Sequence, residues 1–115
     1  PTFGNWVNIP LTWSTGTLKI RRMGQIIHLQ GLIQVTITGV NSAVTGKPVG
    51  AIPGGFPSPA PAKTFPITVN PASGSTLGVG ICSFGNQSIT LFPDSRFLDQ
   101  NCAYIIDQLF AVDWG

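Results

Sequence analysis

Residues 25–38 have the sequence QIIHLQGLIQVTIT, and this stretch decides the fold class. A residue period of two predicts a β-strand with one buried face. The stretch is much longer than the usual strand of about 5–6 residues, so we expect it to run the height of a barrel or sandwich. We expect Gly31 to mark a bulge or bend. The inward set is apolar or Gly: Ile27, Leu29, Gly31, Ile33, Val35 and Ile37.

The other face of this strand is mostly polar, but it also has apolar members. Ile26 and Leu32 lie on it together with His28 and Gln30. A strand face that only met solvent would not need two large aliphatic side chains. We therefore expect this second face to line a boundary with another subunit.

The composition limits the class of protein. The 115 residues correspond to one domain, residues 1–115. Only 9% of the residues are charged and 43% are hydrophobic, which fits a folded subunit that hides surface in an oligomer. The net charge is +2 and no basic run exceeds Arg21–Arg22, so we expect no nucleic-acid partner. No apolar run approaches the roughly 20 residues that span a membrane.

The ends and the cysteines give weaker information. The chain opens with PTFGNW and has no initiator Met, so we expect the C-terminal domain of a longer protein, with residues 1–14 leading in from a preceding module. This segment should include a short edge strand. Cys82 and Cys102 could form one disulfide or none, and we expect two buried thiols.

The remaining strands are expected as short alternating runs separated by turns. Met23–Gly24 and Gly85–Asn86 should connect hairpins, the second through a type II′ turn. We expect Asp107–Gln108 to be a turn, and Pro66 to place its strand at an edge. Residues 51–63 contain four Pro in AIPGGFPSPAPAK, which predicts an extended crossover on the surface or along a barrel end. The expected runs are 17–22, 49–52, 64–69, 77–84, 87–92, 103–106 and 109–114.

Residues 77–84 and 87–92 should form the second hairpin. We expect Leu77, Val79 and Ile81 to face inward against Ile89 and Leu91. Gly78 and Gly80 would then leave the other face bare. With no convincing helix, the chain predicts an all-β fold: an antiparallel Greek-key β-barrel or sandwich of seven or eight short strands.

The order of these pieces resembles a known family. A basic strand (LKIRR, 18–22) precedes the long strand, and the crossover 52–59 is IPGGFPSP, with Ile52 where the family has Leu. This pattern resembles the receptor-binding head domain of lactococcal siphophages, at the tail-fibre or baseplate tip of phages of Gram-positive bacteria. The resemblance implies a homotrimer of β-barrels that follows a shoulder or neck module. It also implies a location on the virion and reversible binding of host cell-wall saccharide or phosphosaccharide.

The resemblance implies a saccharide site of His, Asp, Arg and Trp near subunit boundaries. Asp and Arg can bind vicinal hydroxyl groups, and an aromatic ring can cover the apolar side of a sugar. Each candidate also has a purely structural explanation. His28 could be an interface histidine, the loop with Asp94, Arg96 and Asp99 could hold a local ion pair, and Trp114 could be a packed terminal ring. Arg21 and Arg22 could bind a phosphosaccharide, or form a solvated turn. The candidates are His28, Asp94, Arg96, Asp99 and Trp114.

An enzyme is not expected from this sequence. Asp94 and Asp99 are the only near pair of carboxylates for a glycosidase, and no G-x-S-x-G elbow or P-loop is present. One His and two Cys on separate segments do not make a zinc site, and we expect no cofactor. The sequence therefore predicts non-catalytic carbohydrate binding. The alternatives are a structural trimerisation domain at the end of a tail fibre, or a polysaccharide depolymerase.

Overall fold

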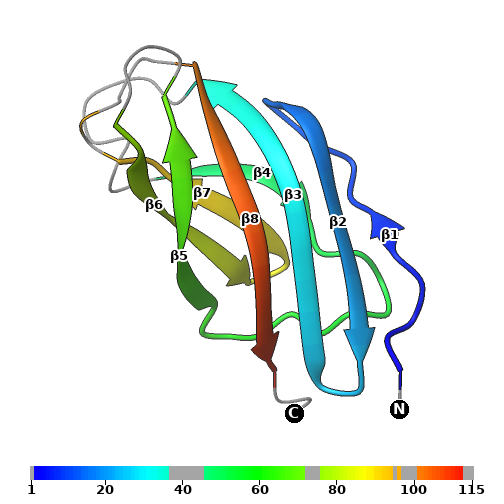
Figure 1. The fold of residues 1–115 in the computed structure, drawn as a ribbon. Coiled ribbons are helices and arrows are strands. Elements are labelled where there is room, and N and C mark those ends of the chain that lie inside the picture. The colour runs from blue at the N-terminus through cyan, green and yellow to red at the C-terminus, as the bar shows by residue number, and fades with distance from the viewer. Residues whose placement is uncertain (1, 37–45, 72–75, 95, 97–100, 113–115) are drawn as a thin grey trace.

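The computed structural model describes residues 2–36, 46–71, 76–94, 96 and 101–112. These residues form one curled, half-barrel antiparallel sheet and no helix, which confirms the all-β prediction (Figure 1). The sheet has eight strands in the order β1-β2-β3-β8-β5-β6-β7-β4. The strands are β1 (Val7–Asn8), β2 (Thr15–Met23), β3 (Ile26–Thr36), β4 (Lys47–Ala51), β5 (Lys63–Asn70), β6 (Gly78–Gly85), β7 (Ser88–Phe92) and β8 (Asn101–Ala111).

β3 is the long strand that the sequence predicted, and it lies between β2 and β8. Of its inward residues, Ile27, Leu29, Ile33 and Val35 are buried, as expected for the apolar set of a period-two pattern, and Ile37 lies outside the described residues. The register runs through Gly31 without a shift, since Gly31 pairs with Leu18 on β2 and Ile106 on β8, so the bulge expected there is absent. A side chain at Gly31 would collide with the backbone oxygen of Thr17. Gly31 is therefore explained by the close approach of β2.

The connections include a Greek key. β5, β6 and β7 form a meander, and β8 returns to lie beside β5. β5 pairs with β8 only over Thr68–Asn70, while it pairs with β6 from Lys63 to Val69. The prediction that Pro66 lies on an edge strand was therefore wrong. Pro66 instead lies on a part of β5 that has no β8 partner. No ladder hydrogen bond is lost on that side.

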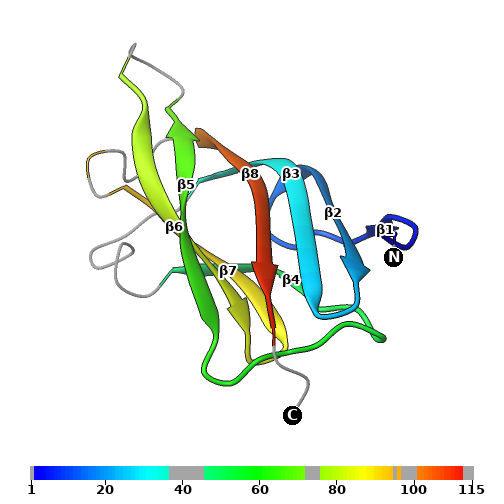
Figure 2. The ribbon, with the colours of Figure 1, turned by 60° about the horizontal axis from the view of Figure 1, so that its bottom comes forward.

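The N-terminal segment closes the gap between the two edges of the curled sheet. The Ile9 amide donates to the Leu18 oxygen on β2, and the Thr12 amide donates to the Val49 oxygen on β4. Ile9 is buried in the core. Figure 2 shows this segment passing from β1 toward β4. These residues are thus an integral part of the barrel wall, including the short edge strand β1 that was expected.

The Pro-rich crossover follows one end of the barrel, as predicted (Figure 1). Arg22 donates to the Gly55 oxygen at 2.9 Å, which fastens the end of β2 to it. At its other side, the Asn86 amide donates to the Pro59 oxygen and the Gln87 amide to the Ser58 hydroxyl. The crossover therefore joins β2 to the β6–β7 hairpin.

Three further sequence predictions about the second half of the chain were wrong. β8 runs unbroken through Asp107–Gln108, because Asp107 points outward and Gln108 inward and so keep the period of two. The β6–β7 turn is Asn86–Gln87, with φ values of 51° and 67° at these residues. Positive φ at both central residues defines a type I′ turn, not type II′.

The facing of β6 is the third of these errors. Leu77, Val79 and Ile81 are exposed, whereas Gly78 and Gly80 are buried. A Cβ on Gly80 would lie 2.6 Å from the Phe92 oxygen, so the backbone of β7 occupies the space of a side chain. The face that the glycines leave bare is filled by a neighbouring backbone, and the apolar face is turned outward.

The core is one cluster of aliphatic, aromatic and thiol side chains inside the curl. Cys82 and Cys102 are buried thiols, as expected. Burial raises the pKa of Cys82 to about 12, which keeps it a thiol. The described part of the chain has no helix that could cross a membrane.

Candidate functional site

The outer face of β2, β3 and β8 holds a cluster of aromatic, charged and imidazole side chains. The register explains the cluster: Arg21 on β2 pairs directly with His28 on β3, and Gln30 pairs with Asp107 on β8. Asp107 is thus the diagonal neighbour of His28, within reach of its ring. Trp6 precedes the β1 residue Val7, which pairs with Ile20, so the N-terminal segment brings Trp6 beside Arg21.

His28 connects two strands through its two ring nitrogens. Arg21 Nε lies 3.1 Å from His28 Nδ1, and His28 Nε2 lies 2.7 Å from Asp107 Oδ1. Because a guanidinium can only donate, Nδ1 is the acceptor and the ring proton is on Nε2, which donates to Asp107. His28 is 8% exposed, although it is on the outer face, because the N-terminal segment covers it.

Aromatic rings of the N-terminal segment hold the cations of β2 in place. The Arg21 guanidinium lies 4.5 Å from the ring centre of Phe3 and 4.3 Å from that of Trp6. Lys19 Nζ lies 4.6 Å from the Trp6 ring centre. The Trp6 and His28 rings are 4.9 Å apart. Cation–π contacts of this kind fix flexible basic side chains at the surface.

Asp107 is the open member of this cluster. Its side chain is 60% exposed, compared with 10% for that of His28. The hydrogen bond from His28 is the main cause that holds the pKa of Asp107 below its usual range, and Gln30 and Arg21 lower it further. The site therefore presents an ionised carboxylate beside ordered cations. The carboxylate can accept hydrogen bonds from sugar hydroxyl groups, and the cations can pair with an acidic substituent.

The second group of candidates lies at the far end of β6 and β7. The Asp94 carboxylate accepts the Val79 amide at 3.1 Å and the Arg96 amide at 3.0 Å. It also pairs with the Arg96 guanidinium at 2.8 Å. By the register that pairs Ile81 with Phe92, Asp94 is opposite Val79, so its side chain continues the ladder beyond β7.

The predicted site residues therefore do not form one site. Hydrogen bonds from Arg96, above all, hold the pKa of Asp94 well below its usual range, and the side chain is only 12% exposed. His28 lies on β3, and the structure does not bring it together with Asp94 and Arg96. Asp99 and Trp114 lie outside the described residues. The role of Asp94 and Arg96 in saccharide binding stays a prediction.

Asp107 and Trp6 were both missed as candidate site residues by the sequence prediction. Asp107 was placed in a turn, although its outward position in an unbroken period of two could have shown it on the same sheet face as His28. Nothing local in the sequence signals Trp6, because its contact with Arg21 depends on the course of the N-terminal segment. Among the described residues no group of three or more His, Cys, Asp or Glu could hold a metal ion.

An apolar row crosses the same outer face beside this cluster. Leu32 pairs with Ile105, Ile105 with Thr68, and Thr68 with Val79, so the row spans β3, β8, β5 and β6. Leu77 and Ile81 extend it along β6, and Leu109 extends it toward His28. We call Leu32, Leu77, Val79, Ile81, Ile105 and Leu109 the apolar outer face; all six are exposed.

The fold is similar to one that is known from a crystal structure. The head domain of phage bIL170, described as a receptor-binding domain of lactococcal phages, superimposes with a TM-score of 0.63 and 16% sequence identity. The match covers 94% of this chain and 97% of that domain. No protein-family model and no curated protein matches the sequence. The similarity therefore concerns the fold, and it agrees with the resemblance that the order of sequence motifs suggested.

Proposed function

We propose that this chain is a receptor-binding head domain at the tail tip or baseplate of a phage, which binds a host cell-wall saccharide without modifying it. The observation that supports this most is the exposed Asp107 carboxylate beside His28, Arg21 and Trp6, in a fold shared with a phage receptor-binding head. This set supplies the His, Asp, Arg and Trp types expected of a saccharide site. In this proposal His28 is a saccharide-site residue, as the sequence predicted, and Asp107 is its partner.

The ionisation of the described carboxylates supports a non-catalytic role. A glycosidase needs one carboxylic acid with a raised pKa, which donates a proton to the leaving group. The pKa values of Asp94 and Asp107 are both lowered. His28 is also a poor general base, because Arg21 already donates to its acceptor nitrogen.

The apolar outer face supports assembly into a homotrimer. It brings together large aliphatic side chains of β3, β8 and β6, with Thr68 of β5 between them, and such exposed patches usually mark an interface. We propose two further copies of this chain as its occupants, because a closed ring around a threefold axis buries the same low-charge face of each copy against a neighbouring copy. Asp107 and Leu109 lie on one strand, so the saccharide site would border the subunit boundary.

Binding tests the saccharide proposal directly. We expect the purified domain to bind at least one member of a panel of wall polysaccharides from Gram-positive bacteria, lactococci included. Asp107→Asn should lower that binding about tenfold or more, because hydrogen bonds to a charged group contribute about 1.5–3 kcal/mol. Asp94→Asn, at the other carboxylate, should leave it unchanged. If the two variants show the reverse pattern, the site belongs to the Asp94 loop.

Light scattering tests the trimer separately from binding. We expect the mass of three chains of 12.1 kDa each at micromolar concentration. Ile105→Asp should give monomers, because it places a charge in the middle of the apolar outer face. Val7→Asp is a matched control, since Val7 is exposed on the edge strand β1. A wild-type mass of one chain would refute the trimer.

A structural end domain without a ligand is the second candidate, and the breadth of the apolar outer face favours it. It predicts trimers that bind no polysaccharide in the panel. Release of reducing ends from any polysaccharide would instead indicate a depolymerase.

A further inference from the structure

Trp13 is the most exposed large hydrophobic side chain of the described residues, at 73%. Its backbone has a φ of 61°, a left-handed conformation that bulky residues rarely adopt. Neither feature stabilises the fold, because an exposed ring contributes little buried apolar area and a positive φ strains the backbone. A residue that is unfavourable in both respects is a candidate for binding.

The strained turn at Trp13 is held firmly in place. The Thr12 amide donates to the Val49 oxygen at 2.9 Å, and the Thr12 hydroxyl donates to the Pro48 oxygen at 3.4 Å. The Ser14 hydroxyl donates back to the Thr12 oxygen at 3.1 Å. The ring is therefore presented from a turn anchored on β4, and its orientation is set before any ligand arrives.

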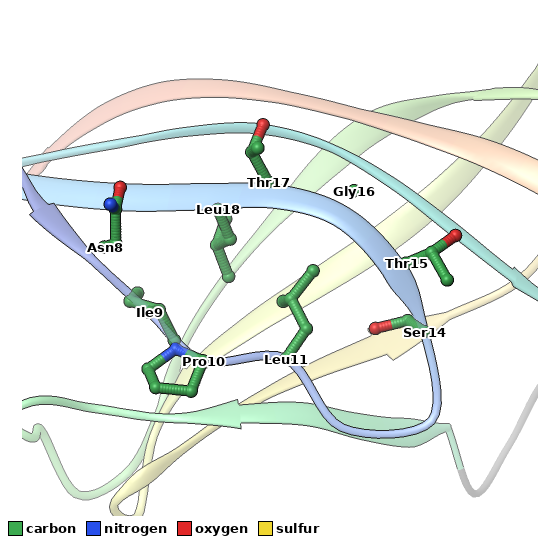
Figure 3. Close-up of a pocket in the computed structure, with 9 residues that line it drawn as sticks. All are labelled: Asn8, Ile9, Pro10, Leu11, Ser14, Thr15, Gly16, Thr17 and Leu18. Carbon is green, nitrogen blue, oxygen red and sulfur yellow. The ribbon is translucent and has the colours of Figure 1, made fainter.

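A cation and a groove adjoin this turn. Lys47 Nζ, at the start of β4, lies 5.1 Å from the centre of the Trp13 ring. A groove of about 320 Å³ runs between the N-terminal segment and β2, and its two walls are joined by the Thr12–Trp13 turn (Figure 3). Leu11 and Leu18 point into it and Ser14 lies at its end, so it offers an apolar floor and a hydroxyl group.

We propose that Trp13 and Lys47 form a second saccharide subsite, which takes a sugar with an anionic substituent such as a phosphate. The ring covers the apolar side of the sugar, Lys47 pairs with the anion, and Ser14 in the groove supplies a hydroxyl partner. This inference rests on the proposed function, because it assigns a further subsite to a saccharide-binding head.

The subsite is distinct from the His28–Asp107 cluster. Thr15 and Arg21 lie at opposite ends of β2, and six residues of strand correspond to about 20 Å. A polymer with repeating units could occupy both positions, and it would then bind more tightly than its fragments. Fragments should therefore distinguish the two positions.

Nitrogen-15 NMR of the full chain tests the subsite with three probes: glucose 6-phosphate, glucose and inorganic phosphate. We expect glucose 6-phosphate to shift the Trp13 indole N–H signal, assigned from Trp13→Phe, in the millimolar range. Lys47→Gln should weaken this binding about two- to fivefold, as expected for one exposed ion pair, and should leave glucose binding unchanged. Lys63→Gln is the matched control and should have no effect. No indole shift with either sugar, or an equal effect of the control, would overturn the proposal.

Trp13→Gly separates binding from a structural role. Gly adopts positive φ without strain, so this variant should keep its melting temperature and its oligomeric state while it loses the sugar response. A lower melting temperature or a changed mass would mean that Trp13 packs in the assembly, and the subsite would be wrong. If Asp107→Asn abolishes polysaccharide binding but Trp13→Gly does not reduce it, the proposed function stands and this inference fails.

Discussion

Asp107 and Asp94 are two carboxylates with an arginine nearby and a lowered pKa, and yet their surroundings differ. Asp94 is 12% exposed and accepts hydrogen bonds from two backbone amides and the Arg96 guanidinium. Asp107 is 60% exposed and accepts from His28, which is 79 residues away in the sequence. The hydrogen bonds of the Asp94 carboxylate are filled by Val79 and by its sequence neighbour Arg96. The Asp107 carboxylate, which is bonded to a residue on another strand, stays exposed and can accept hydrogen bonds from a ligand.

The largest effect should come from the arginine of the His28–Asp107 cluster. Arg21→Ala removes the stacking on Phe3 and Trp6 and the donor to His28, so we expect a loss of about 1–3 kcal/mol in the free energy of unfolding. Urea unfolding measures it. Arg21→Lys keeps the charge without the planar group and should recover only part of the loss. Full recovery by Arg21→Lys would mean that charge alone matters here.

Asp94→Ala should have the next largest effect. It removes the acceptor of the Val79 amide and of the Arg96 amide, which costs about 1–2 kcal/mol in the free energy of unfolding. Asp107→Ala should cost less, because that side chain is mostly exposed. The ranking is read from urea midpoints measured side by side, and an inverted order would contradict the contrast between the two carboxylates.

The pH dependence of stability should also follow Asp94. Its folded pKa lies below the unfolded value of about 3.9, so the unfolded state binds the extra proton. The stabilisation is thus present above about pH 4 and is lost as the pH falls through the folded pKa. Melting temperatures between neutral pH and about pH 3 should fall less steeply in Asp94→Asn than in the wild type. Parallel curves would show that Asp94 does not couple to folding.

Arg96→Gln should have the smallest effect. Its side chain is 58% exposed and its contact with Asp94 is local, so we expect little change in the free energy of unfolding. Arg96→Gln and Arg21→Ala, measured on the same polysaccharide, also test the site assignment. Greater loss of binding in Arg96→Gln would move the saccharide site to the Asp94 loop.

Some of these features could be predicted from the sequence. The inward set of β3 follows from the period of two alone, since Ile27, Leu29, Ile33 and Val35 are buried. The facing of β6 could not, because both of its faces are small or apolar and Gly80 is buried only where β7 approaches. β8 was divided in the prediction because two polar residues resemble a turn, although they keep the alternation.

The sequence by itself determined an all-β antiparallel domain, a long central strand and a Pro-rich crossover, since these depend on local periodicity and on the dihedral limits of proline. Only the tertiary structure decided which residues meet on the outer face. Trp6, Arg21, His28 and Asp107 come from the N-terminal segment, β2, β3 and β8, and the course of that segment and the strand register place them side by side. Register depends on the pairing of whole strands, so no short stretch of sequence contains it.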